Sequence, residues 1–116
     1  MKALFIQFPK CTTCKNALKW LKENEIEVEE RSIVEDNPTK EELLVWIEKS
    51  GLDYRKFFNM SGQMCREMNI KEKARSMSLE EAVDLLSTHG MLVKRPILVT
   101  EDKVLIGFKE DQYKSL

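Results

Sequence analysis

The sequence predicts a single α/β domain, and three observations carry this prediction. The chain has 116 residues, which is the length of one domain. Residues 2–34 show an apolar run, a helical pattern and a second strand pattern, as in a β-α-β unit. Near the end, the apolar runs "PILVT" and "KVLIGF" are joined by "EDK", which is a hairpin signal.

The first three elements follow from hydrophobic periodicity. "KALFIQF", residues 2–8, is apolar nearly throughout, which is typical of a central strand buried on both faces. A helical pattern follows, with Thr12 or Thr13 as its expected N-cap and Asn24 as its expected end. Residues 26–34 alternate apolar and acidic side chains and predict a half-exposed strand. The short helix-to-strand connection predicts that the two strands are parallel.

Residues 35–90 predict a helical insertion between the two strand regions. Thr39 and Glu42 form a capping-box pattern that begins a helix, and Gly51 has the position of its C-terminal glycine. No linker composition interrupts this part, so we expect one domain over residues 1–116. The other predicted helices are short pieces at 54–58 and 61–68, a helix over 78–90 with Ser78 and Glu81 as its capping box and Gly90 as its end, and a final short helix within 109–116.

Composition excludes several classes of protein. Charged residues make up 34% of the chain and hydrophobic ones 42%, as in soluble globular proteins. No apolar run approaches the roughly 20 residues that span a bilayer, and the N-terminal apolar stretch is too short for a signal peptide. We therefore expect a cytoplasmic protein without membrane contact. The net charge is −1 and its basic residues are dispersed, so we expect no direct nucleic-acid binding, although a protein partner stays open.

Three cysteines in a small cytosolic chain do not suggest a structural disulfide framework. The lone His89 and the lack of a second cysteine pair also argue against a closed zinc site, so we expect no metal. Cys65 lies among methionines in a helical pattern, which favours a small buried hydrophobe. The alternative for Cys65 is a second resolving thiol or a glutathionylation site.

Cys11 and Cys14 form a C-x-x-C pair where the first strand gives way to the first helix. Free backbone N–H groups at a helix N-terminus favour a thiolate, and Lys10 and Lys15 add positive charge nearby. We expect Cys11 to be the exposed nucleophile and Cys14 the shielded resolving thiol, within disulfide reach of each other. A C-x-x-C in a β-α-β unit indicates thioredoxin-like redox chemistry. A metal site shared with another subunit and inert packing are the alternatives.

Arg95 and Pro96 form the second notable pair. Pro96 begins an apolar strand, a position that proline tolerates. In thioredoxin-like folds a cis-proline lies opposite the reactive cysteine, where a backbone edge can hold a substrate chain. Arg95, if it lies beside an anionic sulfur, can hold a thiolate or an oxyanion by bidentate hydrogen bonds. A plain surface charge is the simpler interpretation of Arg95.

Several stretches together resemble the arsenate reductase (ArsC)/Spx family over essentially the whole chain: "CTTCKNALKWL", the helical insertion, "KRPILVT" and "IGFKEDQY". "FFNMSGQMCREM" is most similar to the Spx-related, arsenate-reductase-like subgroup. The resemblance implies a thioredoxin-like (glutaredoxin-like) β-α-β…β-β-α core with an inserted helical subdomain. It also implies that Cys11 is the catalytic cysteine, with Cys14 in place of a serine of the arsenate reductases.

The resemblance also suggests an anion site. Lys15 and Asn16 match an Arg-Asn pair of the arsenate reductases, and Arg95 matches an arginine that binds the arsenate oxyanion. Two further arginines of that site are replaced here by Asn59 and Phe108. Each charge-assisted hydrogen bond contributes roughly 1.5–3 kcal/mol, so a single arginine predicts a weak oxyanion site.

Two functions follow from the resemblance. The first is a thiol–disulfide oxidoreductase of the arsenate-reductase-like, glutaredoxin type, without a bound cofactor and with glutathione or a thioredoxin-type protein as reductant. The alternative is an Spx-like redox-sensing regulator that binds the C-terminal domain of the RNA polymerase α subunit. Gly51 lies near the place of a glycine that Spx uses in that contact, although a helix C-cap also explains it.

Overall fold

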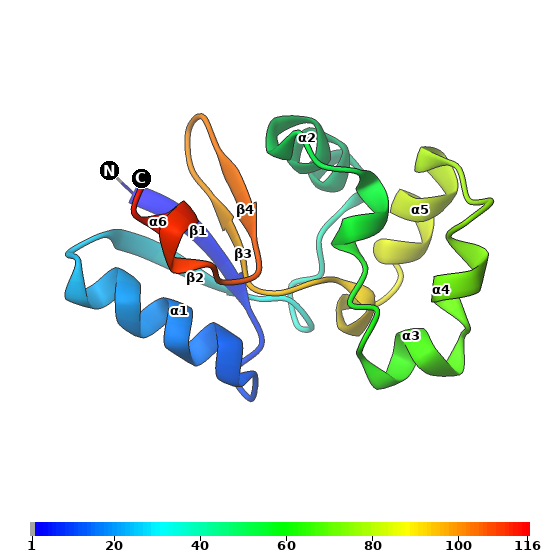
Figure 1. The fold of residues 1–116 in the computed structure, drawn as a ribbon, viewed down its shortest axis with the longest axis horizontal. Coiled ribbons are helices and arrows are strands. Elements are labelled where there is room, and N and C mark those ends of the chain that lie inside the picture. Colours follow the sequence, from blue (N-terminus) through cyan, green and yellow to red (C-terminus); the bar gives the residue numbers. More distant parts are fainter. Residues whose placement is uncertain (1) are drawn as a thin grey trace.

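The computed structural model describes residues 2–116, which form a four-stranded sheet in the order β2-β1-β3-β4 (Figure 1). β1 (Lys2–Gln7) runs parallel to β2 (Glu27–Ser32) and antiparallel to β3 (Ile97–Val99), and β3 pairs antiparallel with β4 (Val104–Ile106). The predicted β-α-β unit, with its parallel strands, and the predicted hairpin are therefore confirmed. This topology is the thioredoxin-like core that the resemblance implied.

Two helices cover one face of the sheet, α1 (Thr12–Glu23) and α6 (Glu110–Tyr113) (Figure 1). Tyr113 is fully buried in this layer, and its ring meets those of Trp20 and Phe108 edge to face. These aromatic contacts join α1, α6 and the turn after β4. The buried residues of the layer are Ala3, Phe5, Ala17, Leu21, Leu98 and Tyr113.

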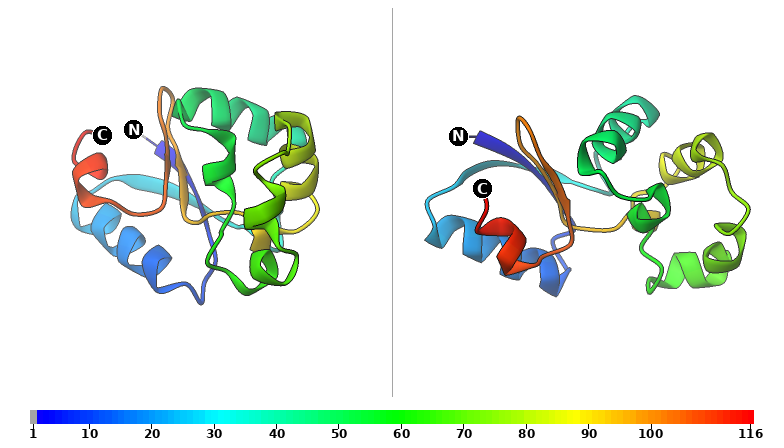
Figure 2. Two further views of the ribbon diagram at one scale, coloured as in Figure 1. Left: turned by 45° about the vertical axis from the view of Figure 1, so that its right-hand side comes forward. Right: turned by 45° about the horizontal axis from the view of Figure 1, so that its top comes forward.

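The helical half lies beyond the other face of the sheet (Figure 2). Ile6, Ile97 and Val104 of the sheet belong to one continuous core with the buried residues of this half. Burying each large apolar side chain contributes about 1.5–3 kcal/mol, so this shared core holds the two halves together. The elements are α2 (Lys40–Ser50), the 3-10 turn η1 (Tyr54–Phe57), α3 (Gln63–Glu67), α4 (Ile70–Lys73), α5 (Leu79–Leu86) and the 3-10 turn η2 (Gly90–Leu92). No helix within residues 2–116 is both long and apolar enough to cross a bilayer.

Helix ends follow several of the predicted signals. Thr39 with Glu42, and Ser78 with Glu81, each form the reciprocal hydrogen bonds of a capping box. Gly51 ends α2 with φ +69°, a left-handed conformation that glycine adopts without steric cost. The helix C-cap thus accounts for Gly51 without a partner protein.

The structure corrects the prediction at two helix ends and adds one helix. The N-cap of α1 is Cys11, because the helix already begins at Thr12. α5 ends at Leu86, four residues before Gly90, which instead opens η2. Gly90 is required by packing: a Cβ atom there would lie 1.8 Å from the carbonyl oxygen of Ile33. α4 was not foreseen, since its N-cap Asn69 is left-handed and leaves no capping pattern in the sequence.

Candidate redox site

The cysteine turn places one sulfur at the start of α1. The amide of Cys11 donates to the carbonyl of Phe8 at 2.9 Å, which closes the turn after β1. The carbonyl of Cys11 accepts the first helical hydrogen bond, from the amide of Lys15 at 3.1 Å. Cys11 is therefore the boundary residue of the helix, and its side chain lies among the amides of the first turn that have no partner within the helix.

The two sulfurs of this turn have opposite acidities. Partial burial works to raise the pKa of Cys11, but the amide and thiol of Cys14 and the positive charge of Arg95 together hold that pKa below its usual value. The Cys11 side chain makes no capping hydrogen bond as a neutral thiol. The backbone amides of Thr13 and Cys14 lower its pKa because they favour the thiolate. Cys14 is fully buried, and burial raises its pKa to about 12, with the neighbouring Cys11 sulfur adding to the effect.

Arg95 supplies the positive charge of the site. Its guanidinium lies 5.2 Å from the ring centre of Phe8 and donates one long hydrogen bond, 3.4 Å, to the carbonyl of Val93. Its Nε atom is buried without a hydrogen-bond partner in the described part of the chain. The Arg95–Pro96 peptide bond is cis. Because the Nε atom is buried, it is the terminal nitrogens of this guanidinium, at the cavity, that can hold an acceptor group of an incoming molecule.

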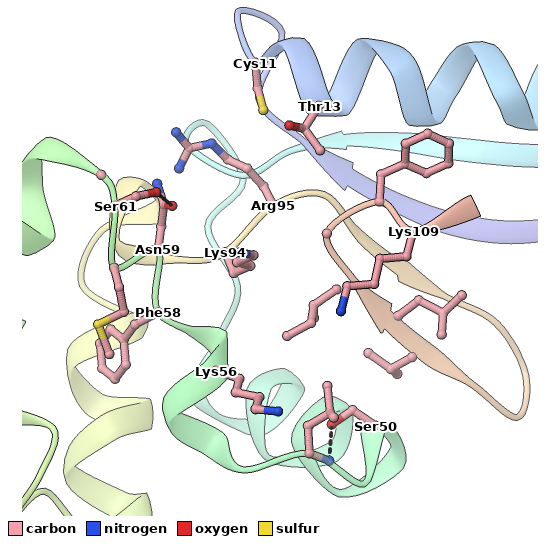
Figure 3. A pocket seen from close by; sticks show the side chains of 18 of the residues that line it. Cys11, Thr13, Ser50, Lys56, Phe58, Asn59, Ser61, Lys94, Arg95 and Lys109 are labelled. Atoms are coloured by element: carbon pink, nitrogen blue, oxygen red, sulfur yellow. Dashed lines mark hydrogen bonds between the residues drawn. The ribbon is translucent and has the colours of Figure 1, made fainter. Parts of the chain in front are cut away.

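A cavity of about 990 Å³ opens in front of Cys11, between β4 and the helical half (Figure 3). We call it the cationic groove, because no Asp or Glu is found among its lining residues. Figure 3 shows Lys56 and Lys109 reaching into it from opposite sides, with Arg95 between Cys11 and Asn59. Its four cationic residues are Lys56, Lys94, Arg95 and Lys109.

Comparison with known proteins fits this geometry. The ArsC family model matches residues 6–116. The chain belongs to the ArsC family. It is 51% identical to the protein YusI of Bacillus subtilis over 98% of this chain and 97% of YusI, and 31% identical to the regulatory protein MgsR of the same organism over 97% of this chain and 87% of MgsR. A crystal structure of an ArsC-family-related protein from Bacteroides fragilis superposes with a TM-score of 0.96 at 52% identity, covering 99% of this chain and 97% of that one.

The structure brings most of the residues singled out from the family resemblance to one place. Cys11, Arg95, Asn59 and Phe108 all line the cationic groove. Cys14 lies behind Cys11 in the first turn of α1 and does not line the groove. A single arginine therefore stands where the arsenate reductases are expected to have three, although lysines share the cavity.

Three residues of the predicted substrate and anion site lie elsewhere, and one of them, Pro96, is buried and does not line the groove. Lys15 and Asn16 are exposed on α1 and are not among the lining residues. Lys15 borders a separate shallow depression along the outer side of α1. Arg95, and neither Lys10 nor Lys15, supplies the main positive charge that lowers the pKa of Cys11. The expected source of positive charge is thus corrected, because both lysines extend into solvent, where their charges are screened.

Three lysines of the groove were missed from the sequence. Lys56 precedes the end of η1, Lys94 precedes Arg95, and Lys109 follows β4. They are far apart along the chain and separated by acidic residues, so no charged cluster marks them. The only local signal was the Lys94-Arg95 dipeptide.

Cys65 has a different environment from the cysteine turn. It lies in α3 with 1% of its surface exposed, and its Sγ is 3.7 Å from the carbonyl oxygen of Leu92. Burial raises the pKa of this thiol. These features agree with the interpretation as a small buried hydrophobe. Within residues 2–116, no three side chains of the types His, Cys, Asp and Glu cluster as metal ligands would.

Proposed function

We propose that this ArsC-family protein is a thiol–disulfide redox protein that cycles between a Cys11–Cys14 dithiol and a Cys11–Cys14 disulfide. One observation supports this most strongly: an acidic, accessible sulfur lies against a shielded sulfur of high pKa. Thiolates are the nucleophiles of disulfide exchange, so the order of the two steps follows from the two acidities.

In the first step, the Cys11 thiolate attacks one sulfur of a substrate disulfide. A bond forms between that sulfur and Cys11, the substrate S–S bond breaks, and the other substrate sulfur leaves as a thiolate with the electron pair. Arg95, whose charge already favours the thiolate of Cys11, also lies where it can stabilise the negative charge that moves through the three sulfurs.

In the second step, Cys14 displaces the substrate from Cys11. While Cys11 is a thiolate, its charge and its hydrogen bond raise the pKa of Cys14. Both effects disappear when Cys11 is bound to the substrate, so Cys14 becomes more acidic at the moment it is needed. Cys14 loses its proton and attacks the Cys11 sulfur, and the substrate leaves as a thiol. Two electrons have then passed from the protein to the substrate.

A thiol reductant must complete the cycle. Two molecules of glutathione, with one thiol each, or the dithiol of a thioredoxin-type protein, would donate two electrons to the Cys11–Cys14 disulfide and become a disulfide themselves. No cofactor is needed for this exchange. Arsenate is a weaker candidate substrate, because Asn59 and Phe108 contribute no charge beside Arg95.

Mass spectrometry of trapped intermediates tests this proposal. Reduced protein is mixed with oxidised glutathione, quenched with acid and alkylated. We expect wild-type protein to end with a Cys11–Cys14 disulfide, and Cys14→Ser to stop as a glutathione adduct on Cys11. Cys11→Ser should give neither product. A stable adduct on Cys14, or no reaction of the wild-type protein, would contradict the proposal.

A second candidate function is a redox-controlled regulator that binds the C-terminal domain of the RNA polymerase α subunit. The relative MgsR is named a regulatory protein, and α2 exposes two adjacent apolar side chains, Leu44 (42% exposed) and Val45 (54%). A pull-down with the isolated polymerase domain, made with oxidised and with reduced protein, tests this function. Absence of binding in both states would remove it.

A further inference from the structure

The cationic groove follows the outer edge of β4. Residues 104, 105, 106 and 107 all line it in succession. Side chains alternate between the faces of a strand, so a cavity against one face touches every second residue only. Here Val104 and Ile106 pack with the core of the helical half, whereas Leu105 packs with the α1–α6 layer. A cavity that touches all of these residues must therefore run along the strand edge.

The backbone at this edge has donors and acceptors that point into the groove. The amide of Gly107 donates to the carbonyl of Pro96, and the amide of Thr100 to the carbonyl of Lys103, each at 2.8 Å. Every second residue of an antiparallel strand bonds inward, so the N–H and C=O groups of Val104 and Ile106 point outward. β4 is the last strand of the sheet, so within residues 2–116 no strand pairs with its outer edge.

The charge around this edge selects the kind of strand that fits. The four cationic residues of the groove form no ion pair with any described residue. The whole chain has a net charge of −1, so the positive charge is a local feature. The opposite edge strand, β2, has acidic side chains instead, at Glu27, Glu29 and Glu30. Charge complementarity therefore favours an acidic ligand at β4.

We propose that the cationic groove binds an extended acidic segment of a protein substrate, which adds to β4 as a fifth strand and presents its disulfide to Cys11. This inference rests on the proposed redox function and names its substrate class. The groove, about 990 Å³, is at the upper end of the roughly 300–1,000 Å³ typical of small-molecule pockets. Residues 104–107 span about 10 Å at ~3.3 Å per residue, which is more than an oxyanion requires.

The chemistry at Cys11 stays the same for such a substrate. The Cys11 thiolate attacks the disulfide sulfur of the bound segment, the S–S bond breaks, and its other sulfur leaves as a thiolate with the electron pair. Strand pairing contributes affinity through the main chain, and the lysines contribute selectivity for acidic side chains. The groove thus determines which disulfide reaches Cys11 and leaves the exchange itself unchanged.

Short peptides can test both parts of the proposal. Each peptide has a central cysteine in a mixed disulfide with thionitrobenzoate, whose release is followed by absorbance. One peptide has glutamates around the cysteine, and a matched peptide has glutamines. We expect the acidic peptide to react roughly tenfold faster at low salt, with the difference shrinking as salt is added. Equal rates would overturn the charge argument.

Backbone methylation isolates strand addition from charge. Acidic peptides are prepared with one N-methyl group at each of two adjacent residues. Only alternate amides of an added strand pair with β4, so methylation at one position should slow release about two- to tenfold and at its neighbour much less. Equal effects at both positions would overturn strand addition.

A mixed disulfide of glutathione with thionitrobenzoate tests the groove proposal separately from the redox function. Suppose that thionitrobenzoate release requires Cys11 with every probe but is as fast with glutathione as with the acidic peptide. This result would overturn the groove proposal and leave the redox function standing. No release with any probe would contradict the redox function itself.

Protein variants provide the matched controls. Lys56→Gln with Lys109→Gln should remove most of the preference, so that this variant releases thionitrobenzoate from the acidic and the glutamine peptide at nearly the same rate. Lys71→Gln makes the same kind of charge change on α4, where the side chain is exposed outside the groove, and should leave the preference intact. Equal loss in both proteins would show that net charge, and not the groove, selects the peptide.

A second copy of this chain is the competing occupant, since β2 is an acidic edge. Sedimentation of the reduced protein tests for this occupant. If the protein self-associates at the concentration where its rate with the acidic peptide begins to fall, β2 of another copy fills the groove. That result would overturn the proposal. A monomer at the assay concentration supports it.

Discussion

The cysteine turn and the Cys65 site lie close to the same arginine, yet their thiols behave in opposite ways. The charge of Arg95 lowers the pKa of Cys11 and also acts in that direction on Cys65. Cys11 is partly exposed at the start of a 12-residue helix, whereas Cys65 is buried inside a helix of five residues. For Cys65 burial outweighs the arginine, and for Cys11 the amides and the arginine outweigh burial. Because the charge of Arg95 acts on both thiols, the difference between their pKa values comes from solvation and hydrogen bonds.

Removing each sulfur should give the largest contrast between the two sites. Cys11→Ser is expected to lower the rate of exchange with oxidised glutathione at least about a hundredfold, because no other accessible thiolate is available. Cys65→Ser should leave that rate within about twofold. Stopped-flow measurement of disulfide exchange checks both. A Cys65→Ser protein as inactive as Cys11→Ser would overturn the contrast.

Removing the shared charge should separate the two thiols further. Arg95→Gln is expected to raise the pKa of Cys11, because one of the causes that lower it is lost. Alkylation at neutral pH should then slow several-fold, and the pH midpoint should move upward. Lys10→Gln is the matched control, since Lys10 is adjacent in sequence but is not among the main causes of the shift. If Lys10→Gln moved the midpoint as far as Arg95→Gln, the assignment of the charge to Arg95 would fail.

The ion pair between Arg31 and Glu42 should make the stability of the fold depend on pH in the acid range. Hydrogen bonds from Arg31, at 2.6 and 2.9 Å, lower the pKa of Glu42 to about 2. The unfolded carboxyl has a pKa of about 4.3, so the stabilisation is complete above about pH 4.3 and lost as pH falls towards 2. Glu42→Gln should cost about 1–2 kcal/mol of unfolding free energy at pH 7 and little at pH 2. Urea denaturation at both pH values measures this. An equal cost at both values would contradict the assignment.

The smallest effect is expected when the side-chain volume of Cys65 is reduced. Cys65→Ala should lower the free energy of unfolding by about 1 kcal/mol, because a small cavity remains in the core of the helical half. The pH profile of Cys11 alkylation should not move. Denaturation and alkylation of the same variant therefore distinguish a packing role from a redox role, and a shifted alkylation profile would indicate the latter.

Much of the fold could be predicted because its signals are local. The buried run of β1, the two capping boxes and the β3–β4 hairpin each lie within a few adjacent residues. The end of α5 could not be predicted, because the reason for Gly90 is contact with the backbone of Ile33, far away in the sequence. Glycine near a helix end has several causes, and only the fold distinguishes them.

The candidate site divides in the same way. The C-x-x-C pair was visible as a motif, and Arg95 through the family resemblance. The lysines of the groove were not visible, because three separate segments bring them together. Lys15 is close to Cys11 in the sequence, but a helix directs successive side chains around its axis, so closeness along the chain does not imply closeness to the sulfur.

The central claim is that Cys11 is an acidic thiol and Cys14, three residues away, is not. The most direct test is the rate of iodoacetamide alkylation of each cysteine against pH, with the sites separated by mass spectrometry. We expect Cys11 to react with a midpoint clearly below that of an ordinary cysteine, about 8.5, and Cys14 to stay unreacted across the neutral range. A midpoint for Cys11 at or above the ordinary value, or equal labelling of both sulfurs near pH 7, would contradict the account.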